Sequence, residues 1–285
     1  MKDTILFGDC RETLSQIDEK VRMCVTSPPY YGLRNYGDEG KQIGLEDTPE
    51  EYINNLVNIF RSVRNCLSDD GTLWVNIGDS YYNYRPGKGQ ALVKQTVSAT
   101  KQDLPDKCAR RGNKLEGLKE KDLIGIPWML AFALRADGWY LRQDIIWNKP
   151  NPMPESVRDR CTKSHEYMFL LSKNQNYYFD VDVIKEPTRR KRSVWNINKK
   201  PYKGSHFAVF PPELITPCIL AGSEENDIVL DPFIGSGTTA MVARDLGRHY
   251  IGCELHEEYN DLIQQRVPDD KVVHNGLTNA FEDVE

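Results

Sequence analysis

The chain has 285 residues, of which 39% are hydrophobic, and it carries a formal net charge of −5 with a pI of about 5.7. This length allows one large α/β domain or two smaller ones, and no apolar run approaches the roughly 18 residues that a membrane span needs. The start lacks the apolar segment of a secretory signal, so we expect a cytoplasmic protein without a membrane partner. Seven scattered cysteines without a CxxC pair predict reduced thiols, and neither a disulfide framework nor a metal site.

Short apolar runs typical of strands alternate along the chain with patterns typical of helices. In chain order, the expected elements are strands at 4–7 and 21–25, a helix at 49–67, a strand at 72–77, a helix at 127–136, strands at 144–147 and 167–171, a helix at 212–221, a strand at 228–230, a helix at 238–246 and a strand at 250–253. This alternation favours an α/β fold with a mostly parallel sheet and helices on both faces. We expect a single domain over residues 1–285.

Two polar stretches interrupt the alternation, at 81–121 and at 182–205, and both are basic in an acidic chain. Residues 185–203 hold eight Lys or Arg against one acid, and residues 85–121 hold ten against four. The local distribution of charge matters more than the net charge for a protein that binds nucleic acid with part of its surface. The alternative is that each charge run is only a solvated face.

A glycine-rich turn, Asp231-Pro232-Phe233-Ile234-Gly235-Ser236-Gly237-Thr238-Thr239, lies between an expected strand and an expected helix. Gly235 and Gly237 allow positive φ and a close approach of the backbone to a ligand, and a helix start presents free N–H groups. The spacing is neither that of a P-loop nor the dinucleotide GxGxxG pattern. Glu254, at the end of the next strand, can accept hydrogen bonds from ribose hydroxyls. The turn therefore predicts a nucleoside cofactor; the alternative is a tight turn with a surface glutamate.

The tetrapeptide Ser27-Pro28-Pro29-Tyr30 follows the expected strand 21–25 and suits the methylation of an aromatic amine. The lone pair of such an amine is delocalised into the ring, so the nitrogen is a poor nucleophile. The Ser27 hydroxyl and the Pro28 carbonyl can accept its two hydrogens and favour a pyramidal nitrogen, while the prolines fix the backbone. Tyr30 can stack on a base rotated out of the duplex. A Pro-Pro loop without chemistry is the alternative.

Together and in this order, the two motifs resemble those of the DNA amino-methyltransferases, in the β circular-permutation group. In that group, as here, the catalytic motif precedes the cofactor loop, and the resemblance covers almost the whole chain. It implies a circularly permuted, Rossmann-like, S-adenosylmethionine-dependent methyltransferase fold with inserted DNA-recognition segments. It also implies direct displacement of the methyl group, without a covalent enzyme intermediate.

The resemblance implies a role for each residue of the two motifs. Ser27, Pro28, Pro29 and Tyr30 would be catalytic. The residues that would bind S-adenosyl-L-methionine are Asp9, Asp231, Phe233, Gly235, Ser236, Gly237, Thr238 and Glu254. Within this set, Asp9 would contact the adenine amine and Glu254 the ribose. Asp9 has an alternative role as the N-cap of a helix at 11–17.

Within the resembling family, Ser before Pro-Pro is associated with N4-cytosine methylation and Asp with N6-adenine methylation. Ser27 therefore favours cytosine, and N6-adenine is the alternative. A methyltransferase of RNA or protein and an inactive DNA-binding relative are less favoured, because Asn or Asp usually stands before Pro-Pro in the RNA and protein enzymes and the site residues are intact here.

The partner expected from the resemblance is double-stranded DNA, with a homodimer as an open alternative. Arginine can bind guanine through two hydrogen bonds, and Lys or Arg on phosphates supplies affinity that depends on salt. We expect the main DNA contacts from the segment that also carries Trp195 and Tyr202: Arg189, Arg190, Lys191, Arg192, Lys199 and Lys200. Residues 81–121 are a second candidate. A bacterial or phage source fits these expectations, and the target sequence is not readable.

Overall fold

The computed structural model describes residues 1–32, 42–82, 115–199, 210–268, 271–274 and 277–278. The strands in these ranges are β1 (Thr4–Phe7), β2 (Val21–Thr26), β3 (Leu67–Ile77), β4 (Tyr140–Asn148), β5 (His165–Ser172), β6 (Val194–Asn196), β7 (Ile228–Asp231), β8 (His249–Glu254), β9 (Lys271–His274) and β10 (Leu277–Thr278). The helices are α1 (Cys10–Thr13), α2 (Pro49–Cys66), α3 (Ile126–Ala136), α4 (Pro212–Gly222), α5 (Thr238–Asp245) and α6 (Asn260–Arg266), with short 3-10 helices η1 (Leu14–Gln16) and η3 (Glu257–Tyr259).

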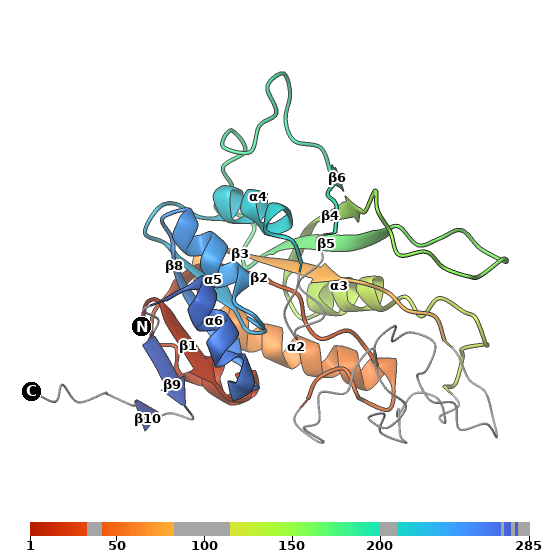
Figure 1. Cartoon of the computed structure of the whole chain (residues 1–285), viewed down its shortest axis with the longest axis horizontal. Coiled ribbons are helices and arrows are strands. Elements are labelled where there is room, and N and C mark those ends of the chain that lie inside the picture. Colours follow the sequence, from red (N-terminus) through yellow and green to blue (C-terminus); the bar gives the residue numbers. More distant parts are fainter. Residues whose placement is uncertain (33–41, 83–114, 200–209, 269–270, 275–276, 279–285) are drawn as a thin grey trace, which may run out of the picture.

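The strands form one sheet in the order β10-β9-β1-β8-β7-β2-β3-β5-β4-β6 (Figure 1). The six strands from β9 to β3 are parallel, β5 is antiparallel to both β3 and β4, and β10 is antiparallel to β9. The sheet is therefore mostly parallel, and the helices lie on both of its faces, as the sequence predicts.

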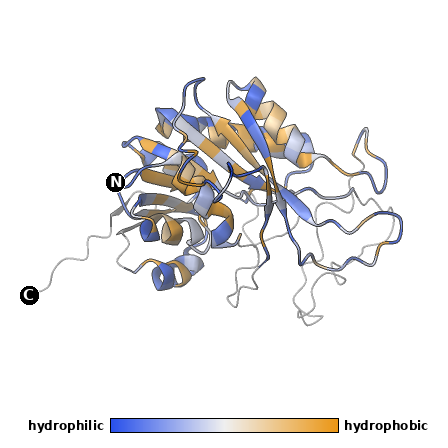
Figure 2. Ribbon diagram, turned by 90° about the horizontal axis from the view of Figure 1, so that it is seen from above, coloured by the Kyte–Doolittle hydropathy of each residue, from blue (hydrophilic) through white to orange (hydrophobic). Residues whose placement is uncertain are grey.

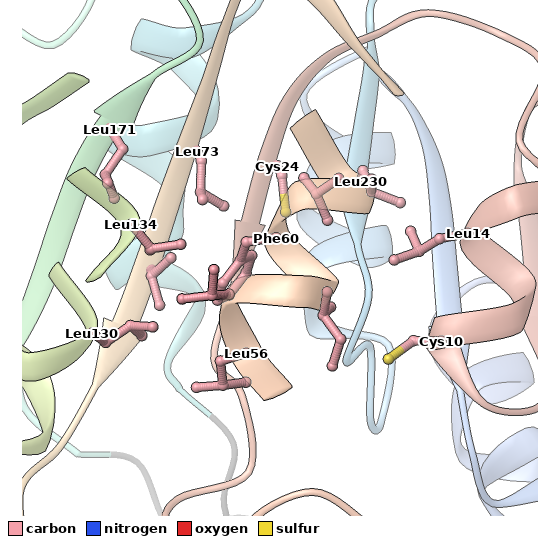
Figure 3. Close-up of a cluster of buried hydrophobic side chains, with 14 of the residues drawn as sticks. Cys10, Leu14, Cys24, Leu56, Phe60, Leu73, Leu130, Leu134, Leu171 and Leu230 are labelled. Carbon is pink, nitrogen blue, oxygen red and sulfur yellow. The ribbon is translucent and has the colours of Figure 1, made fainter. Parts of the chain in front are cut away.

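Each face of the sheet is covered by its own helices and has its own apolar core. On one face, α2 and α3 pack on the sheet through residues such as Leu56, Phe60 and Leu130, which Figure 3 shows with Leu73 of β3. On the other face, α4, α5 and α6 pack through a second group of residues: Ile215, Cys218, Val242 and Ile263. Figure 2 shows apolar residues concentrated on the strands and on the sides of the helices that meet them.

Helix α2 illustrates why the sequence pattern specifies its element. Thr48 caps it by accepting a hydrogen bond from Glu51 N–H at 3.1 Å, and Pro49 stands at its first turn. Tyr52, Leu56 and Phe60 recur at four-residue spacing and are fully buried. The helix thus has a cap, a start signal and one continuous apolar side that packs on the sheet.

The main departure from the expected elements is at the start of β3, which begins at Leu67 and not at Thr72. The intervening residues are polar and end in Gly71, a composition typical of a turn. The register of β2 and β3 shifts here, from Val21 paired with Leu67 to Met23 paired with Thr72, so residues 68–71 form an irregularity opposite Arg22. Arg22 stabilises this region through ion pairs with Asp70 and Asp227. Strands β6, β9 and β10 have two to four residues each and were not expected from the sequence.

The connections of the sheet reverse direction between β2 and β7. From β2 the chain passes through α2 to β3 on one side, and from β7 it passes through α5 to β8 on the other side. The two helices cover opposite faces of the sheet. Ligands of open α/β sheets bind beyond the carboxyl ends of the strands at such a reversal. The fold therefore directs attention to the residues that follow β2 and β7.

Candidate active site

The carboxyl ends of five adjacent parallel strands meet at one edge of the sheet. In spatial order they are β1, β8, β7, β2 and β3, and they lead respectively into Asp9, Glu254, the glycine turn, Ser27 and Gly78. The two motifs that stand about 200 residues apart in the sequence thus follow neighbouring strands, with Cys24 paired to Leu230. The structure places the expected cofactor loop directly beside the expected catalytic tetrapeptide.

Asp231 joins the two motifs through its buried carboxylate, which is 1% exposed. Its Oδ1 accepts from Thr26 Oγ1 at 2.5 Å and from Phe233 N–H at 3.0 Å, and its Oδ2 accepts from Thr239 Oγ1 at 2.6 Å. Burial raises the pKa of Asp231 to about 6, although these three hydrogen bonds oppose the shift. The side chain links the residue before Ser27 to both ends of the glycine turn.

The tetrapeptide itself is fixed at its aromatic end by buried partners. Tyr52 of α2 donates its hydroxyl to the Pro29 carbonyl at 2.8 Å. The Tyr30 hydroxyl donates to Glu166 Oε2 at 2.8 Å and lies 3.3 Å from Asn76 Oδ1. Burial, and then the Glu166 carboxylate, raise the pKa of Tyr30 well above its usual value, so the phenol is neutral at physiological pH.

Gly78, directly after β3, is the close neighbour of the Tyr30 ring. A Cβ atom at Gly78 would lie 2.8 Å from Tyr30 Cε2 and 3.3 Å from Glu166 Cγ. No side chain at this position could avoid the ring without displacing it. The ring is thus confined by contact as well as by its hydrogen bonds.

The glycine turn has the backbone that the sequence predicts. Gly235 and Gly237 have φ of 55° and 82°, and Gly237 N–H bonds the Ile234 carbonyl at 3.0 Å. Glu254 accepts from Gly235 N–H through Oε2 and from His256 N–H through Oε1, both at 2.9 Å. The glutamate at the end of β8 therefore holds the turn directly.

Two observations show that this turn fits the expected S-adenosyl-L-methionine. Among the described residues, Ser236 Oγ is buried without a hydrogen-bond partner, which is costly unless a ligand supplies one. Burial raises the pKa of Glu254 to about 8 despite its backbone hydrogen-bond donors, so its carboxylate can gain from further donors such as ribose hydroxyls. Residues Gly235, Ser236 and Gly237 would surround the nucleoside cofactor together with Glu254.

The other predicted cofactor residues take different positions. The Thr238 hydroxyl accepts from the Arg266 guanidinium of α6, and Phe233 is half-buried against the core on the α2 side. Asp9 is the N-cap of α1, accepting from Arg11 N–H at 2.9 Å, and it also pairs with the Arg11 guanidinium. The alternative role of Asp9, as the N-cap of a helix, is thus observed. Asp9 stands at the carboxyl end of β1, which pairs with β8.

The predicted DNA-binding residues are not gathered in one place. Lys199 follows β6 and lies near Lys149 and Glu166, and burial and then Lys149 lower its pKa. By contrast, residues 189–192 precede β6, the outermost strand of the sheet, and so lie toward its amino end. There Arg189 pairs with Glu186. Lys200 lies outside the described residues, as do most of 81–121 and the end of 182–205.

Trp195, which lies within the segment expected to bind DNA, is not itself available for DNA contact. Its side chain is 5% exposed and belongs to the core between β4 and α4. It pairs with Trp147 in the register of β4 and β6, and its Nε1–H donates to the Arg192 carbonyl at 2.7 Å. The aromatic residue thus anchors the basic segment to the sheet.

The sequence also left unrecognised the partners that hold Tyr30. Asn76 and Glu166 accept hydrogen bonds from the phenol, and Lys149 pairs with Glu166; the three residues come from three different strands or their ends. The available signal was that polar residues stand within or directly after apolar strands, where a buried polar side chain needs a partner. In the described ranges, no group of three or more His, Cys, Asp or Glu side chains could hold a metal ion. No helix there is long and apolar enough to span a membrane.

A Rossmann-like sheet with this glycine turn and this tetrapeptide side by side defines an S-adenosylmethionine-dependent methyltransferase. The sequence profile of the DNA methylase family of N6 and N4 enzymes matches residues 21–265. The chain is 53% identical over 276 residues to the Type II methyltransferase M.SmaI of Serratia marcescens, covering 92% of this chain and 90% of that protein. It is 50% identical over 270 residues to M.Cfr9I of Citrobacter freundii, covering 93% and 87%. The chain therefore belongs to the N6/N4 DNA methylase family.

Solved structures share the fold. The PvuII DNA methyltransferase, described as cytosine-N4-specific, superposes with a TM-score of 0.69 at 20% identity over 93% of this chain and 86% of that one. A putative DNA modification methylase from Thermus thermophilus, complexed with S-adenosyl-L-methionine, gives 0.64 at 23% identity over 95% and 97%. The protein is an S-adenosylmethionine-dependent DNA methyltransferase, and S-adenosyl-L-methionine is its cofactor.

The raised pKa of Glu254 predicts that cofactor affinity depends on pH. At pH 6 the carboxyl is mostly protonated, since its pKa is about 8. A ligand that donates hydrogen bonds to the carboxylate favours the ionised form, so binding below pH 8 must release a proton. We expect the Kd for S-adenosyl-L-methionine to fall, by up to about tenfold per pH unit, as the pH rises from 6 to 8.

Isothermal titration calorimetry across this range would measure the effect, with Glu254→Gln as the control that removes the titrating group. The variant should bind more weakly, with a flatter profile, and it subtracts any titration of the ligand itself. Parallel profiles for the two proteins would contradict the prediction. In the protein without cofactor, the raised pKa of Glu254 lowers the free energy of unfolding as the pH rises from about 4.5 to 8. The reason is that the unfolded chain loses this proton at a lower pH than the folded chain.

Proposed function

We propose that this enzyme methylates the exocyclic N4 amine of a cytosine that is flipped out of duplex DNA, by direct displacement and without a covalent enzyme intermediate. The observation that carries the proposal is the position of Ser27 and Pro28 at the end of β2, joined through Thr26 and Asp231 to the glycine turn after β7. S-adenosyl-L-methionine supplies the activated methyl group. Methylation of N6 of adenine by the same residues is the second candidate, because both bases present an exocyclic amine.

Each residue of the tetrapeptide has a role in this proposal. The Ser27 hydroxyl and the Pro28 carbonyl accept the two hydrogens of the target amine and localise the nitrogen lone pair. Pro28 and Pro29 restrict the backbone, and Tyr52 donates a hydrogen bond to the Pro29 carbonyl. The Tyr30 ring stacks on the flipped base, which a duplex would otherwise keep out of reach.

The choice of cytosine rests on Ser27. In this family Ser before Pro-Pro is associated with N4-cytosine methylation, although a hydroxyl and a carboxylate can both accept from either amine. The test is to incubate the enzyme with duplex DNA of mixed sequence and the cofactor, digest the product to nucleosides and identify the modified base by mass spectrometry. N4-methylcytosine is the expected product. N6-methyladenine would refute the assignment of the base while leaving the mechanism intact.

We propose that the basic residues around β6 contribute to binding double-stranded DNA. Arg190 and Arg192 are exposed, and Lys191 lies 5.1 Å above the Trp195 ring. Replacing Arg189, Arg190 and Arg192 together with glutamine should weaken DNA binding and leave cofactor binding unchanged. Each lost phosphate contact should reduce the slope of log K against log salt by about 0.9.

The matched control removes three exposed charges with glutamine at Lys2, Lys20 and Arg244. Lys2 and Lys20 precede β1 and β2, and Arg244 lies in the last turn of α5 before β8. Fluorescence anisotropy with labelled duplex at several salt concentrations would measure both proteins. Equal slopes for the two triple variants would show that the residues at 189–192 form only a solvated surface. A restriction-modification role, as the Type II relatives suggest, and a homodimer remain predictions that no described contact addresses.

A further inference from the structure

The hydroxyl of Tyr30 lies at one end of a buried chain of polar side chains that ends at Lys149. Tyr30 donates to Glu166 Oε2 at 2.8 Å, and Lys149 Nζ forms an ion pair with Glu166 Oε1. Asn76 Nδ2 lies 3.4 Å from Glu166 Oε2 and donates to the Tyr167 carbonyl at 3.0 Å. The side chains of Lys149 and Glu166 are only 12% and 17% exposed. The pair is therefore largely withdrawn from water.

Four strands contribute to this chain of contacts. Tyr30 follows β2, Asn76 lies in β3, Glu166 is near the start of the antiparallel β5, and Lys149 follows β4. Because β5 runs against its neighbours, its amino end lies at the edge where β2, β3 and β4 end. Glu166 is paired with Trp147 in the register of β4 and β5, two residues before Lys149. The sheet topology thus brings the acid to the catalytic edge.

An ion pair in this position is not explained by stability alone. Withdrawing two charges from water costs several kcal/mol, and apolar replacements of buried pairs are often neutral or stabilising. What the pair provides is a defined hydrogen-bond direction. Lys149 Nζ lies 4.2 Å from the centroid of the Trp147 ring and pairs with Glu166. A carboxylate oxygen accepts hydrogen bonds, and the Tyr30 hydroxyl donates to Glu166 Oε2.

The shortest hydrogen bond of the Tyr30 hydroxyl, at 2.8 Å, is thus the one to Glu166, with Asn76 Oδ1 at 3.3 Å as a further acceptor, and the ring lies against Gly78. We propose that Glu166, braced by Lys149, is a positioning residue that sets the Tyr30 ring in the plane required to stack on the flipped base. The inference rests on the proposed stacking role of Tyr30. Its consequence is that Glu166 acts on base flipping and on the rate through Tyr30, without contact with the cofactor loop.

The experiment compares Glu166→Ala, Glu166→Gln and Lys149→Met with wild type. Glu155→Gln is the matched control, since Glu155 pairs with Arg160 in the same β4–β5 connection and has no described contact with Tyr30. The readouts are kcat, KM for DNA, Kd for the cofactor, and the fluorescence of pyrrolocytosine placed at the target base, which reports loss of stacking in the duplex. The DNA is a duplex in which the position of the methylated base has first been mapped by mass spectrometry of oligonucleotide fragments.

We expect Glu166→Ala to lower kcat by about tenfold to hundredfold through misplacement of the ring. It should also change the fluorescence of the bound DNA, while the cofactor Kd stays within about twofold of wild type and confirms folding. Glu166→Gln should restore most of the rate, because its amide oxygen still accepts from Tyr30. Lys149→Met should fall between these two variants, and Glu155→Gln should behave as wild type.

A Glu166→Ala enzyme with the kcat and fluorescence of Glu155→Gln would overturn the inference. So would a Glu166→Gln enzyme as slow as Glu166→Ala, since charge and not orientation would then matter. Tyr30→Ala, measured in the same assays, separates the inference from the proposed function. If Tyr30→Ala leaves base flipping unchanged, the stacking role itself fails. If it abolishes the signal while Glu166→Ala does not, only the positioning role fails.

Discussion

Replacing Ser27 with alanine is expected to lower kcat for DNA methylation by roughly 10²- to 10³-fold, a loss of the size seen when one preorganised hydrogen bond to a transition state is removed. The reason is that, in the proposed mechanism, the Ser27 hydroxyl accepts one of the two hydrogens of the target amine and the Pro28 carbonyl accepts the other. Without it, one N–H of the amine has no acceptor and the lone pair stays delocalised. The effect should appear in single-turnover kinetics, which isolate the chemical step.

The cofactor Kd of Ser27→Ala should remain within about twofold of wild type, because Ser27 makes no described hydrogen bond to the glycine turn. The turn is held by the carboxylates of Asp231 and Glu254 and by backbone hydrogen bonds. Ser68→Ala is a matched control: Ser68 is also half-buried, but its hydroxyl bonds Asp70 at the opposite end of the sheet. Ser27→Asp retains an acceptor and should recover part of the rate. A normal rate for Ser27→Ala would exclude Ser27 from the chemistry.

The elements and both motifs could be predicted from the sequence because their signals are local. The glycine turn lies between a strand and a helix within about twenty residues, and the cap, proline and apolar spacing of α2 all fall within one helix. The expected strands and helices all occur, and the largest difference in their bounds is that β3 begins at Leu67, before the polar stretch 68–71. Local chemistry was thus sufficient for the architecture and for the location of the site.

The contacts that hold the site together could not be predicted, because they join residues far apart in the sequence. Tyr30 and Glu166 are separated by 136 positions, and Thr26 and Asp231 by 205. Trp195 shows the same limit: its place in a basic segment suggested a surface residue, whereas the pairing of β6 with β4 buries it. In each case the sheet order decides which side chains meet, and no local pattern carries that order.

Asp231 is the residue for which the structure gives a role that the sequence did not, and this role carries the second large prediction. Asp231→Ala would leave the hydroxyls of Thr26 and Thr239 and the Phe233 N–H in the interior without their acceptor. A buried group that loses its partner costs about 1–3 kcal/mol. We expect the free energy of unfolding to fall by about 3–5 kcal/mol, at the upper end for a single substitution.

The catalytic consequence is separable from the loss of stability. Because Asp231 connects β2 to the glycine turn, we expect Asp231→Ala to weaken cofactor binding and slow methyl transfer together, by about tenfold or more each. Asp231→Asn keeps one acceptor oxygen and avoids burying a charge, since burial raises the pKa of Asp231 to about 6. It should therefore unfold near the wild-type denaturant midpoint while still losing activity.

Asp79 provides the control for Asp231, because its carboxylate likewise accepts from three groups, here the backbone N–H groups of Ser80, Gly125 and Ile126. Asp79→Ala should cost comparable stability at the start of α3 without changing the cofactor Kd. Urea unfolding and calorimetric titration of the same preparations would decide the matter. If Asp231→Ala binds the cofactor as tightly as Asp79→Ala, the carboxylate stabilises the fold but does not couple the catalytic strand to the cofactor loop.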